Sequence, residues 1–397
     1  MTLTILLDLD DTLLNTNLGS FIPAYFQALA KDLAPHIAPD LMFKALLSGT
    51  RVMNESEDFS QTLEEVFAND FYPQLNVPKG ELDEAIDNFY DHVFPTLAGL
   101  TTQNPKAKPF VEWAFSKGFR IAIATDPLLP RKATDHRLRW AGFEPEQFEL
   151  ITTFEHFHFS KSHATYYAEV LGRLGWPEGP VIMAGNDMER DIIPAKRLGL
   201  TTFHVDAGAA APSGPEADFH GDLQDLRHLI ESTDLSRFNP SYKSFDSIRS
   251  ILSSTPAVLR GLSQNVDPGL WSQPSDADEW AFTELICHLR DAEREIHLAQ
   301  LTLLKEESEP FIPRPDTGIW ANQRNYLQEN GFSALQEYVA ARRNTLAVID
   351  SFKQGEWSRR ARHAIFGPTA FLEVIGFMAD HDRLHVQQAW RILQKQK

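Results

Sequence analysis

The chain begins with the apolar run Leu3-Thr4-Ile5-Leu6-Leu7, which continues directly into Asp8-Leu9-Asp10-Asp11-Thr12-Leu13. A short apolar run that ends in acidic residues is typical of a buried parallel strand, because open α/β sheets hold ligands at the carboxyl ends of their strands. Asp8 and Asp10 would repel each other at a strand tip, so their spacing indicates a bound cation between them. The alternative is an acidic turn, although turns usually contain Gly, Pro or Asn.

Length and charge limit the classes of protein. At 397 residues the chain is too long for one ordinary core, so we expect two domains. The net charge of −18 divides into −16 for residues 1–232 and −2 for residues 233–397. Neither part has the basic surface that nucleic acid requires, and an acidic surface is repelled by anionic membranes, so we expect no nucleic-acid and no membrane partner.

We expect the protein to carry no targeting signal. The N-terminus lacks the basic region and cleavage site of a signal peptide, and no apolar run approaches the roughly 18 residues that span a bilayer. We therefore expect a cytoplasmic protein. A second copy of the chain is a possible partner, in a homodimer.

Strands and helices alternate through residues 1–232. Residues 15 to about 100 show helical apolar spacing, which predicts a helical insertion after the first strand. This alternation predicts an α/β doubly wound parallel sheet, a Rossmann-like fold. Residues 206–215 are expected to be a loop, and residues 233–243 a linker. Further strands are expected at 119–124, 149–153, 180–184 and 201–205, and helices at 110–117, 165–174 and 223–230.

Residues 244–397 are expected to be almost entirely helical. Four amphipathic helices predict an all-α four-helix bundle. The single cysteine, Cys287, lies within one of these patterns and is expected to be a buried thiol. Apolar residues recur at helical spacing over about 247–264, 277–305, 332–353 and 368–394.

Three further polar motifs follow expected strands or precede helices in the first domain. Thr125 offers a hydroxyl and an N–H group to a phosphate oxygen, and Lys161 can neutralise charge during phosphoryl transfer. Asn186, Asp187 and Asp191 can supply further oxygen ligands for Mg²⁺, or carboxylates behind those ligands. Each motif is weak alone, because an Asp-rich turn is often only a helix N-cap. Their joint order along the chain favours a phosphoryl-transfer site.

With these motifs, residues 1–232 resemble the haloacid dehalogenase-like hydrolase superfamily, and residues 15–100 match its helical cap. The resemblance implies that Asp8 attacks phosphorus to form an aspartyl-phosphate, and that Asp10 protonates the leaving oxygen and later activates water. It also implies that the Asp8 side chain and the Asp10 backbone carbonyl bind Mg²⁺. An acid at position 10 favours phosphatase over dehalogenase chemistry, because halide departure needs no proton donor.

One motif departs from the family pattern, which usually has Asp directly after a Gly. Here Asn186 follows Gly185, and Asp187 comes next. Either the neutral Asn186 oxygen binds the metal more weakly, or Asp187 replaces it. The charge of Asp187 slightly favours the second alternative.

Three histidines of the C-terminal half have the spacing of a metal site. His381 and His385 are four residues apart and share one helix face, while His288 belongs to an earlier helix. In a chain with fourteen histidines such a pair can also arise by chance, and a helix His is more often an ordinary core or surface residue.

The context of these histidines resembles the DinB-like four-helix-bundle family over about residues 244–397. The resemblance rests on Glu279 to Leu285, His363, Phe366-Gly367 and the segment His381 to His385. It implies that His288, His381 and His385 bind a divalent transition metal, Zn²⁺ or Ni²⁺, with open coordination positions. His297 and His363 are expected to be packing residues, or groups behind the ligands, rather than ligands.

The sequence therefore predicts a Mg²⁺-dependent phosphatase domain at 1–232, joined to a metal-binding bundle at 244–397. Its substrate would be a small phosphorylated metabolite. Two other functions stay open: a ligand-binding or regulatory protein with weak or no phosphatase activity, and a metal-dependent thiol transferase in the bundle.

Overall fold

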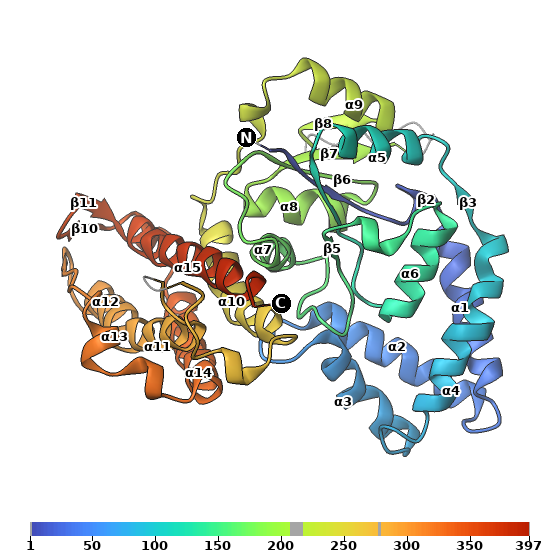
Figure 1. Ribbon diagram of the computed structural model, residues 1–397, viewed down its shortest axis with the longest axis horizontal. Helices are drawn as coiled ribbons and strands as arrows, with labels where there is room; N and C mark the ends of the chain where they lie inside the picture. Colours follow the sequence, from blue (N-terminus) through green and yellow to red (C-terminus); the bar gives the residue numbers. More distant parts are fainter. Residues whose placement is uncertain (1, 207–216, 277–278, 397) are drawn as a thin grey trace. The chain divides into compact units, whose positions relative to one another are not determined.

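The computed structural model describes residues 2–206, 217–276 and 279–396 (Figure 1). These residues form two compact units, one of Met1–Val170 and Pro177–Ser241, the other of Leu171–Trp176 and Tyr242–Lys397. None of the described helices is both long and apolar enough to cross a membrane. Most of the loop expected at 206–215, and the helix start expected at 277, lie outside the described residues.

A six-stranded parallel sheet forms the centre of the first unit, in the order β5-β4-β1-β6-β7-β8. β1 lies between β4 and β6, with Leu7 opposite Ile123 and Ala184. All four residues of β1 are buried, as its continuous apolar sequence requires. The strands are β1 (Thr4–Leu7), β4 (Arg120–Ile123), β5 (Leu150–Ile151), β6 (Val181–Gly185), β7 (Thr201–Val205) and β8 (Phe219–Gly221).

Helices cover both faces of this sheet, which confirms the doubly wound fold. Figure 1 shows α5 (Ala107–Ser116) and α9 (Leu223–Ser232) on one side and α7 (Ala164–Arg173) and α8 (Ile193–Leu198) on the other. The segment expected as a linker contains a 3-10 helix, Leu235–Phe238, and Phe238 is fully buried in the core of this unit.

The insertion after β1 is helical, as the sequence predicts, and has an aromatic core of its own. The rings of Phe21 and Phe94 contact each other and Trp140 of α6 (Arg131–Trp140). β2 (Leu14–Asn15) pairs with β3 (Thr102–Gln103), so the two ends of the insertion are hydrogen-bonded neighbours. Its helices are α1 (Leu18–Asp32), α2 (Pro39–Glu55), α3 (Leu63–Leu75) and α4 (Asp83–Asn88), followed by a π turn at Phe89–Val93 and a 3-10 helix at Phe94–Leu100.

The second unit is a bundle of long helices with a small sheet. The helix expected over 277–305 is interrupted by a π turn, Glu293–His297. A three-stranded sheet of β9 (Phe311–Ile312), β10 (Arg360–His363) and β11 (Gly367–Ala370) was not expected, and it delays the start of the last helix to Phe371. The helices are α10 (Phe245–Ser263), α11 (Phe282–Ala292), α12 (Leu298–Glu306), the short α13 (Trp320–Gln323), α14 (Gly331–Asp350) and α15 (Phe371–Gln394).

Candidate active site and candidate metal centre

A cavity of about 290 Å³ lies at the carboxyl end of the parallel sheet. The chain turns sharply after β1, where Asp11 adopts a φ of 58° and its Oδ1 accepts hydrogen bonds from the N–H groups of Thr16 and Asn17. This turn fixes the acidic segment at the tip of the strand. All seven residues that the sequence predicts for this site line the cavity: Asp8, Asp10, Thr125, Lys161, Asn186, Asp187 and Asp191.

Lys161 joins two buried carboxylates of the cavity. Its Nζ donates to Oδ1 of Asp8 at 2.6 Å and forms an ion pair with Asp191. Burial lowers the pKa of Lys161, but Asp191 and Asp8 raise it more, so the ammonium group stays charged. Burial, Asp191 and Asp10 raise the pKa of Asp8 to about 7, against the opposing effect of Lys161.

Asp10 is held by two residues that the sequence did not indicate. Thr16 Oγ1 donates to Asp10 Oδ1 at 2.8 Å, and the Arg137 guanidinium of α6 forms a buried ion pair with the other oxygen. Arg137 also donates to Thr134 Oγ1 at 3.1 Å. The local pattern gave no signal for this role, because an arginine in a polar helix usually faces solvent. Together these contacts fix the direction of the Asp10 carboxylate.

Thr125 lies in the first turn after β4. Its backbone oxygen accepts hydrogen bonds from Tyr166 Oη at 2.8 Å and Thr152 Oγ1 at 2.6 Å. The next residue, Asp126, accepts from the backbone N–H of Lys161 at 3.2 Å. These bonds tie the loop that carries Thr125 to the loop that carries Lys161.

The three polar residues after β6 have different surroundings. The Asp187 carboxylate caps the next helical turn, because Oδ1 accepts from the N–H groups of Glu189 at 2.8 Å and Arg190 at 3.1 Å. Asp191 accepts from the N–H of Asp187 at 2.9 Å and pairs with Lys161. Asp187 therefore has the capping role that the sequence left as an alternative.

The Asn186 amide faces the acidic pair. With one orientation its oxygen points at Oδ2 of Asp8 and at the backbone oxygen of Asp10, and with the other its nitrogen donates to these atoms at 3.3 and 3.0 Å. Three oxygen atoms that converge in this way form a donor set for a hard cation such as Mg²⁺. In the first orientation the Asn186 oxygen also accepts from Thr12 Oγ1 at 3.4 Å, and a cation among the three oxygens would offset their mutual repulsion.

The three predicted histidines come together in the second unit. His288 of α11 and His381 and His385 of α15 each place one ring nitrogen within 4.8 Å of the others. The Nε2 atoms of His288 and His381 are 3.2 Å apart, and both Nδ1 atoms are buried without a hydrogen-bond partner among the described residues. Burial, followed by the neighbouring histidines His385 and His297, lowers the pKa of His288 to about 3. The rings are therefore neutral at pH 7, which is the form that binds metal.

A buried ionic network packs beside these histidines. Arg342 of α14 donates to Glu293 at 2.8 Å, to the backbone oxygen of Leu252 at 2.7 Å, and to Asp382. Glu293 also bonds Nδ1 of His297 at 2.9 Å, and the His297 ring meets that of His381 edge-on at 5.5 Å. Among the described residues, His297 thus packs against His381 and is not one of the three clustered histidines.

Two further residues complete this region. The half-buried Trp280 ring is parallel to the His385 ring at 6.1 Å and lies 5.1 Å from the His288 ring. Cys287 is buried, as expected, and burial raises the pKa of its thiol to about 12. A thiol in this state is a poor nucleophile.

Comparisons with known proteins match the two parts of the chain separately. A glyceraldehyde 3-phosphate phosphatase of Methanocaldococcus jannaschii is 28% identical over 88 residues, which are 22% of this chain and 37% of that protein. The match thus spans well under two thirds of the relative's own length.

Two solved structures are similar to different parts of the chain. A HAD phosphatase from Thermococcus onnurineus is 18% identical and aligns over 58% of this chain and 98% of its own, with a TM-score of 0.40. YfiT from Bacillus subtilis, described as a probable metal-dependent hydrolase with an unusual four-helix bundle topology, is 15% identical over 39% of this chain and 88% of its own, with a TM-score of 0.35.

Family comparison assigns both halves. Residues 2–199 match the haloacid dehalogenase-like hydrolase family, and residues 251–389 match the DinB superfamily. The parallel sheet with its helical insertion and the helical bundle are the folds expected for these two families. The N-terminal part of this chain is therefore a haloacid dehalogenase-like hydrolase domain, and its C-terminal part is a domain of the DinB superfamily.

Proposed function

We propose that the first unit is a Mg²⁺-dependent phosphatase that hydrolyses a small phosphorylated metabolite through an aspartyl-phosphate. The observation that carries this proposal is the buried contact between Asp8 and Lys161, 2.6 Å long, in a cavity shared with Asp10 and Thr125. A carboxylate nucleophile, an acid and a fixed cation are the groups that phosphoryl transfer to an enzyme side chain requires.

We assign the metal to Asp8, the Asp10 backbone carbonyl and Asn186. The convergence of their oxygen atoms supports this assignment, whereas the Asp187 carboxylate already binds two backbone N–H groups. When bound, Mg²⁺ would neutralise negative charge on the phosphate. Asp191 would act behind this shell, because it holds Lys161 in place.

The side chains then have distinct tasks. A carboxylate oxygen of Asp8 attacks phosphorus as the bond to the leaving oxygen breaks, and Asp10 gives that oxygen a proton. Thr125 and Lys161 bind the phosphate oxygens and offset their charge. In the second step Asp10 takes a proton from water, and the water oxygen attacks phosphorus as the bond from phosphorus to Asp8 breaks, which frees phosphate and restores the Asp8 carboxylate.

The test is hydrolysis of p-nitrophenyl phosphate and a panel of metabolite esters by the full chain with added Mg²⁺. Asp8→Asn should abolish turnover, because an amide is a poor nucleophile. The matched control is Asp40→Asn, on the exposed first turn of α2, which should keep wild-type activity. If Asp8→Asn kept more than about a tenth of wild-type kcat, a loss under roughly 1.4 kcal/mol of barrier, the covalent role would be excluded.

For the second unit we propose that His288, His381 and His385 bind one divalent transition metal, Zn²⁺ or Ni²⁺. The neutral rings and the nitrogen atoms within 4.8 Å of one another support a three-nitrogen site. Three protein ligands leave coordination positions open for a substrate or for water. The Nε2 atoms of His288 and His381 face each other at 3.2 Å, so we take Nε2 as the coordinating atom of both rings.

The fluorescence of Trp280 can report metal binding at this site. Because its ring lies 5.1 Å from His288, binding of Ni²⁺ should quench part of the tryptophan fluorescence, and binding of Zn²⁺ should raise the melting temperature by linkage. The double variant His381→Ala/His385→Ala should lose both effects. The matched control is His220→Ala/His228→Ala, two exposed histidines of the first unit. Equal metal responses in the two double variants would rule out the proposed site.

A further inference from the structure

A second cavity, of about 440 Å³, lies between the helical insertion and the segments that follow β4 and β5. Its volume is within the range of about 300–1,000 Å³ that is usual for small-molecule sites. Phe26, Thr50, Leu128 and Leu129 line both this cavity and the one that contains Asp8, so the two cavities adjoin at these side chains. A phosphate held at Asp8 would direct the rest of an ester toward the insertion.

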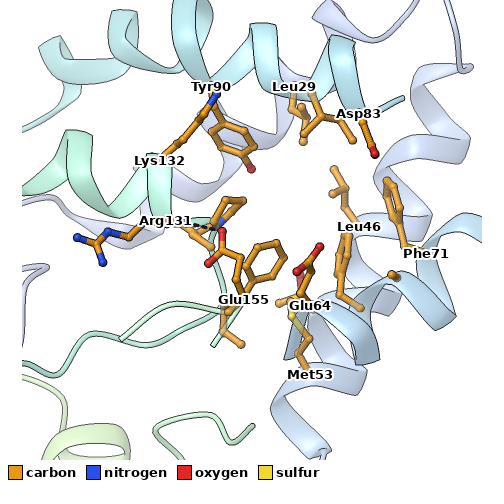
Figure 2. Close-up of a pocket in the computed structure, with 18 of the residues that line it drawn as sticks. Leu29, Leu46, Met53, Glu64, Phe71, Asp83, Tyr90, Arg131, Lys132 and Glu155 are labelled. Atoms are coloured by element: carbon orange, nitrogen blue, oxygen red, sulfur yellow. Dashed lines mark hydrogen bonds between the residues drawn. The ribbon is translucent and has the colours of Figure 1, made fainter. Parts of the chain in front are cut away.

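The walls of this cavity are mostly apolar and aromatic. Phe67 and Phe71 of α3 stack at 4.6 Å, and Figure 2 shows Leu46 and Phe71 along one side of the cavity. Figure 2 shows Tyr90 on the opposite side, and its hydroxyl bonds that of Tyr25, which also lines the cavity, at 2.6 Å. Such walls favour an apolar body of about the size of a ring, because its burial removes apolar surface from water.

The charges around the cavity disfavour an anionic ligand group. Figure 2 shows the carboxylates of Glu64, Asp83 and Glu155 around the cavity, while the Arg131 guanidinium is turned away from it. An anionic ligand group would meet this acidic lining without a cation to pair with. The three cations of the lining form ion pairs of their own: Arg131 with Asp135, Lys132 with Asp87 and Asp91, and Lys79 with Glu64.

Glu155 is the carboxylate of the cavity lining on which the choice of ligand depends. One of its oxygens accepts from the backbone N–H of Arg131 at 2.7 Å, whereas Oε2 is buried with no hydrogen-bond partner among the described residues. Burial raises the pKa of this group more than the neighbouring backbone N–H groups of Arg131 and Glu155 and the Thr153 side chain lower it. A buried acceptor of this kind is stabilised by a ligand that donates a hydrogen bond, most of all by a cationic donor.

We propose, resting on the phosphatase function above, that this cavity binds the alcohol part of the phosphate ester. The alcohol has an apolar body of about ring size and a protonated amine that donates to Glu155. Phosphate esters of amino alcohols with an aryl or branched alkyl body form the substrate class. Esters whose alcohol carries a carboxylate are rejected, because their charge meets Glu64, Asp83 and Glu155.

The first test compares three esters that share one ring: 4-(2-aminoethyl)phenyl phosphate, 4-ethylphenyl phosphate and 3-(4-phosphonooxyphenyl)propanoate. We expect kcat/KM to be highest for the amine and lowest for the carboxylate. Glu155→Gln keeps the acceptor for Arg131 but loses the charge, so the ratio of kcat/KM for the amine over the ethyl ester should fall about tenfold. Glu112→Gln, exposed on α5, should keep the wild-type ratio. An unchanged ratio in Glu155→Gln, or preference for the carboxylate ester, would overturn the proposal.

The second test measures binding without turnover. Tyramine, the free amino alcohol, should bind the full chain in a calorimetric titration, about tenfold more weakly to Glu155→Gln. Ala68→Phe, which adds a ring to the wall of the cavity, should abolish binding. Tyramine binding without hydrolysis of any ester would support the cavity and reject the phosphatase function. Hydrolysis of p-nitrophenyl phosphate without tyramine binding would reject the substrate class alone.

Discussion

Replacing Arg342 by Met should destabilise the bundle at least as much as a large-to-small core substitution does. The guanidinium makes five hydrogen bonds, to Glu293, Asp382 and the backbone oxygen of Leu252. All three charged side chains are fully buried. Met keeps much of the aliphatic volume but leaves two buried carboxylates without their cation. Breaking a buried ion pair in this way costs about 3–5 kcal/mol of unfolding free energy.

The effect of pH separates loss of charge from loss of packing. Burial raises the pKa of Glu293, but Arg342 and His297 lower it more, so it lies far below its ordinary value of 4.5. A carboxyl group with a lowered pKa stabilises the fold above its unfolded pKa and loses this contribution only as the pH falls through its folded pKa. The wild-type network therefore keeps its contribution at pH 5 and at pH 7. In Arg342→Met only His297 still opposes the effect of burial at Glu293, so protonation should relieve part of the cost as the pH falls from 7 to 5.

Hydrogen exchange measured by mass spectrometry on the full chain suits this test, because two units need not unfold as one. Peptides of α14 and α15 report on the bundle, and those of β1 and β6 serve as an internal reference. Arg343→Met, at the exposed neighbouring position, is the matched control and should change the opening free energy by less than about 0.5 kcal/mol. A loss below about 1 kcal/mol in Arg342→Met, or a loss that is the same at both pH values, would refute this reasoning.

Three further outcomes are expected. At limiting Mg²⁺, kcat/KM for a phosphate ester should rise as the pH increases through 7. The reason is that Asp8 attacks as a carboxylate and that its pKa is raised to about 7. A profile that is flat from pH 5 to 8 would contradict this. Asn186→Ala should raise the Mg²⁺ concentration that gives half-maximal activity about tenfold or more, and Asp187→Ala should raise it much less. The reverse order in a Mg²⁺ titration would make Asp187 the ligand. Cys287, with its pKa raised to about 12, should react with Ellman's reagent only after urea unfolds the chain, so rapid labelling of the native protein would show an accessible thiolate.

The sequence predicted the first strand and its site because both depend on local signals and one topological rule. An apolar run followed by acids places Asp8 at a strand end, and the carboxyl ends of parallel strands meet at one edge of the sheet. The contact between Asp8 and Lys161, 153 positions apart, follows from that rule. The histidine cluster could be predicted for a similar reason, since positions four apart share a helix face.

Other features could not be read from local patterns. Nothing in the polar run of α6 indicates that Arg137 rather than Arg139 turns inward to Asp10, because that choice depends on how the helix packs. The strands β8 to β11 have two to four residues each, too short for an alternating pattern. Charge alone slightly favoured Asp187 over Asn186 as the Mg²⁺ ligand, and it gave no sign of the hydrogen bonds that Asp187 Oδ1 accepts from the next helical turn.

The pairing of β2 with β3 has a consequence for how this domain can change over time. Leu14 faces Gln103 and Asn15 faces Thr102, so the polypeptide leaves the sheet domain and returns to it at the same place. Joining neighbouring strands by a tight turn costs little loop-closure entropy, so the segment between them can be shortened, enlarged or exchanged without disturbing β1 or β4. The part of the cavity wall that the insertion supplies can therefore diverge by replacement of one exchangeable module, while Glu155 and the catalytic carboxylates stay where the sheet domain puts them.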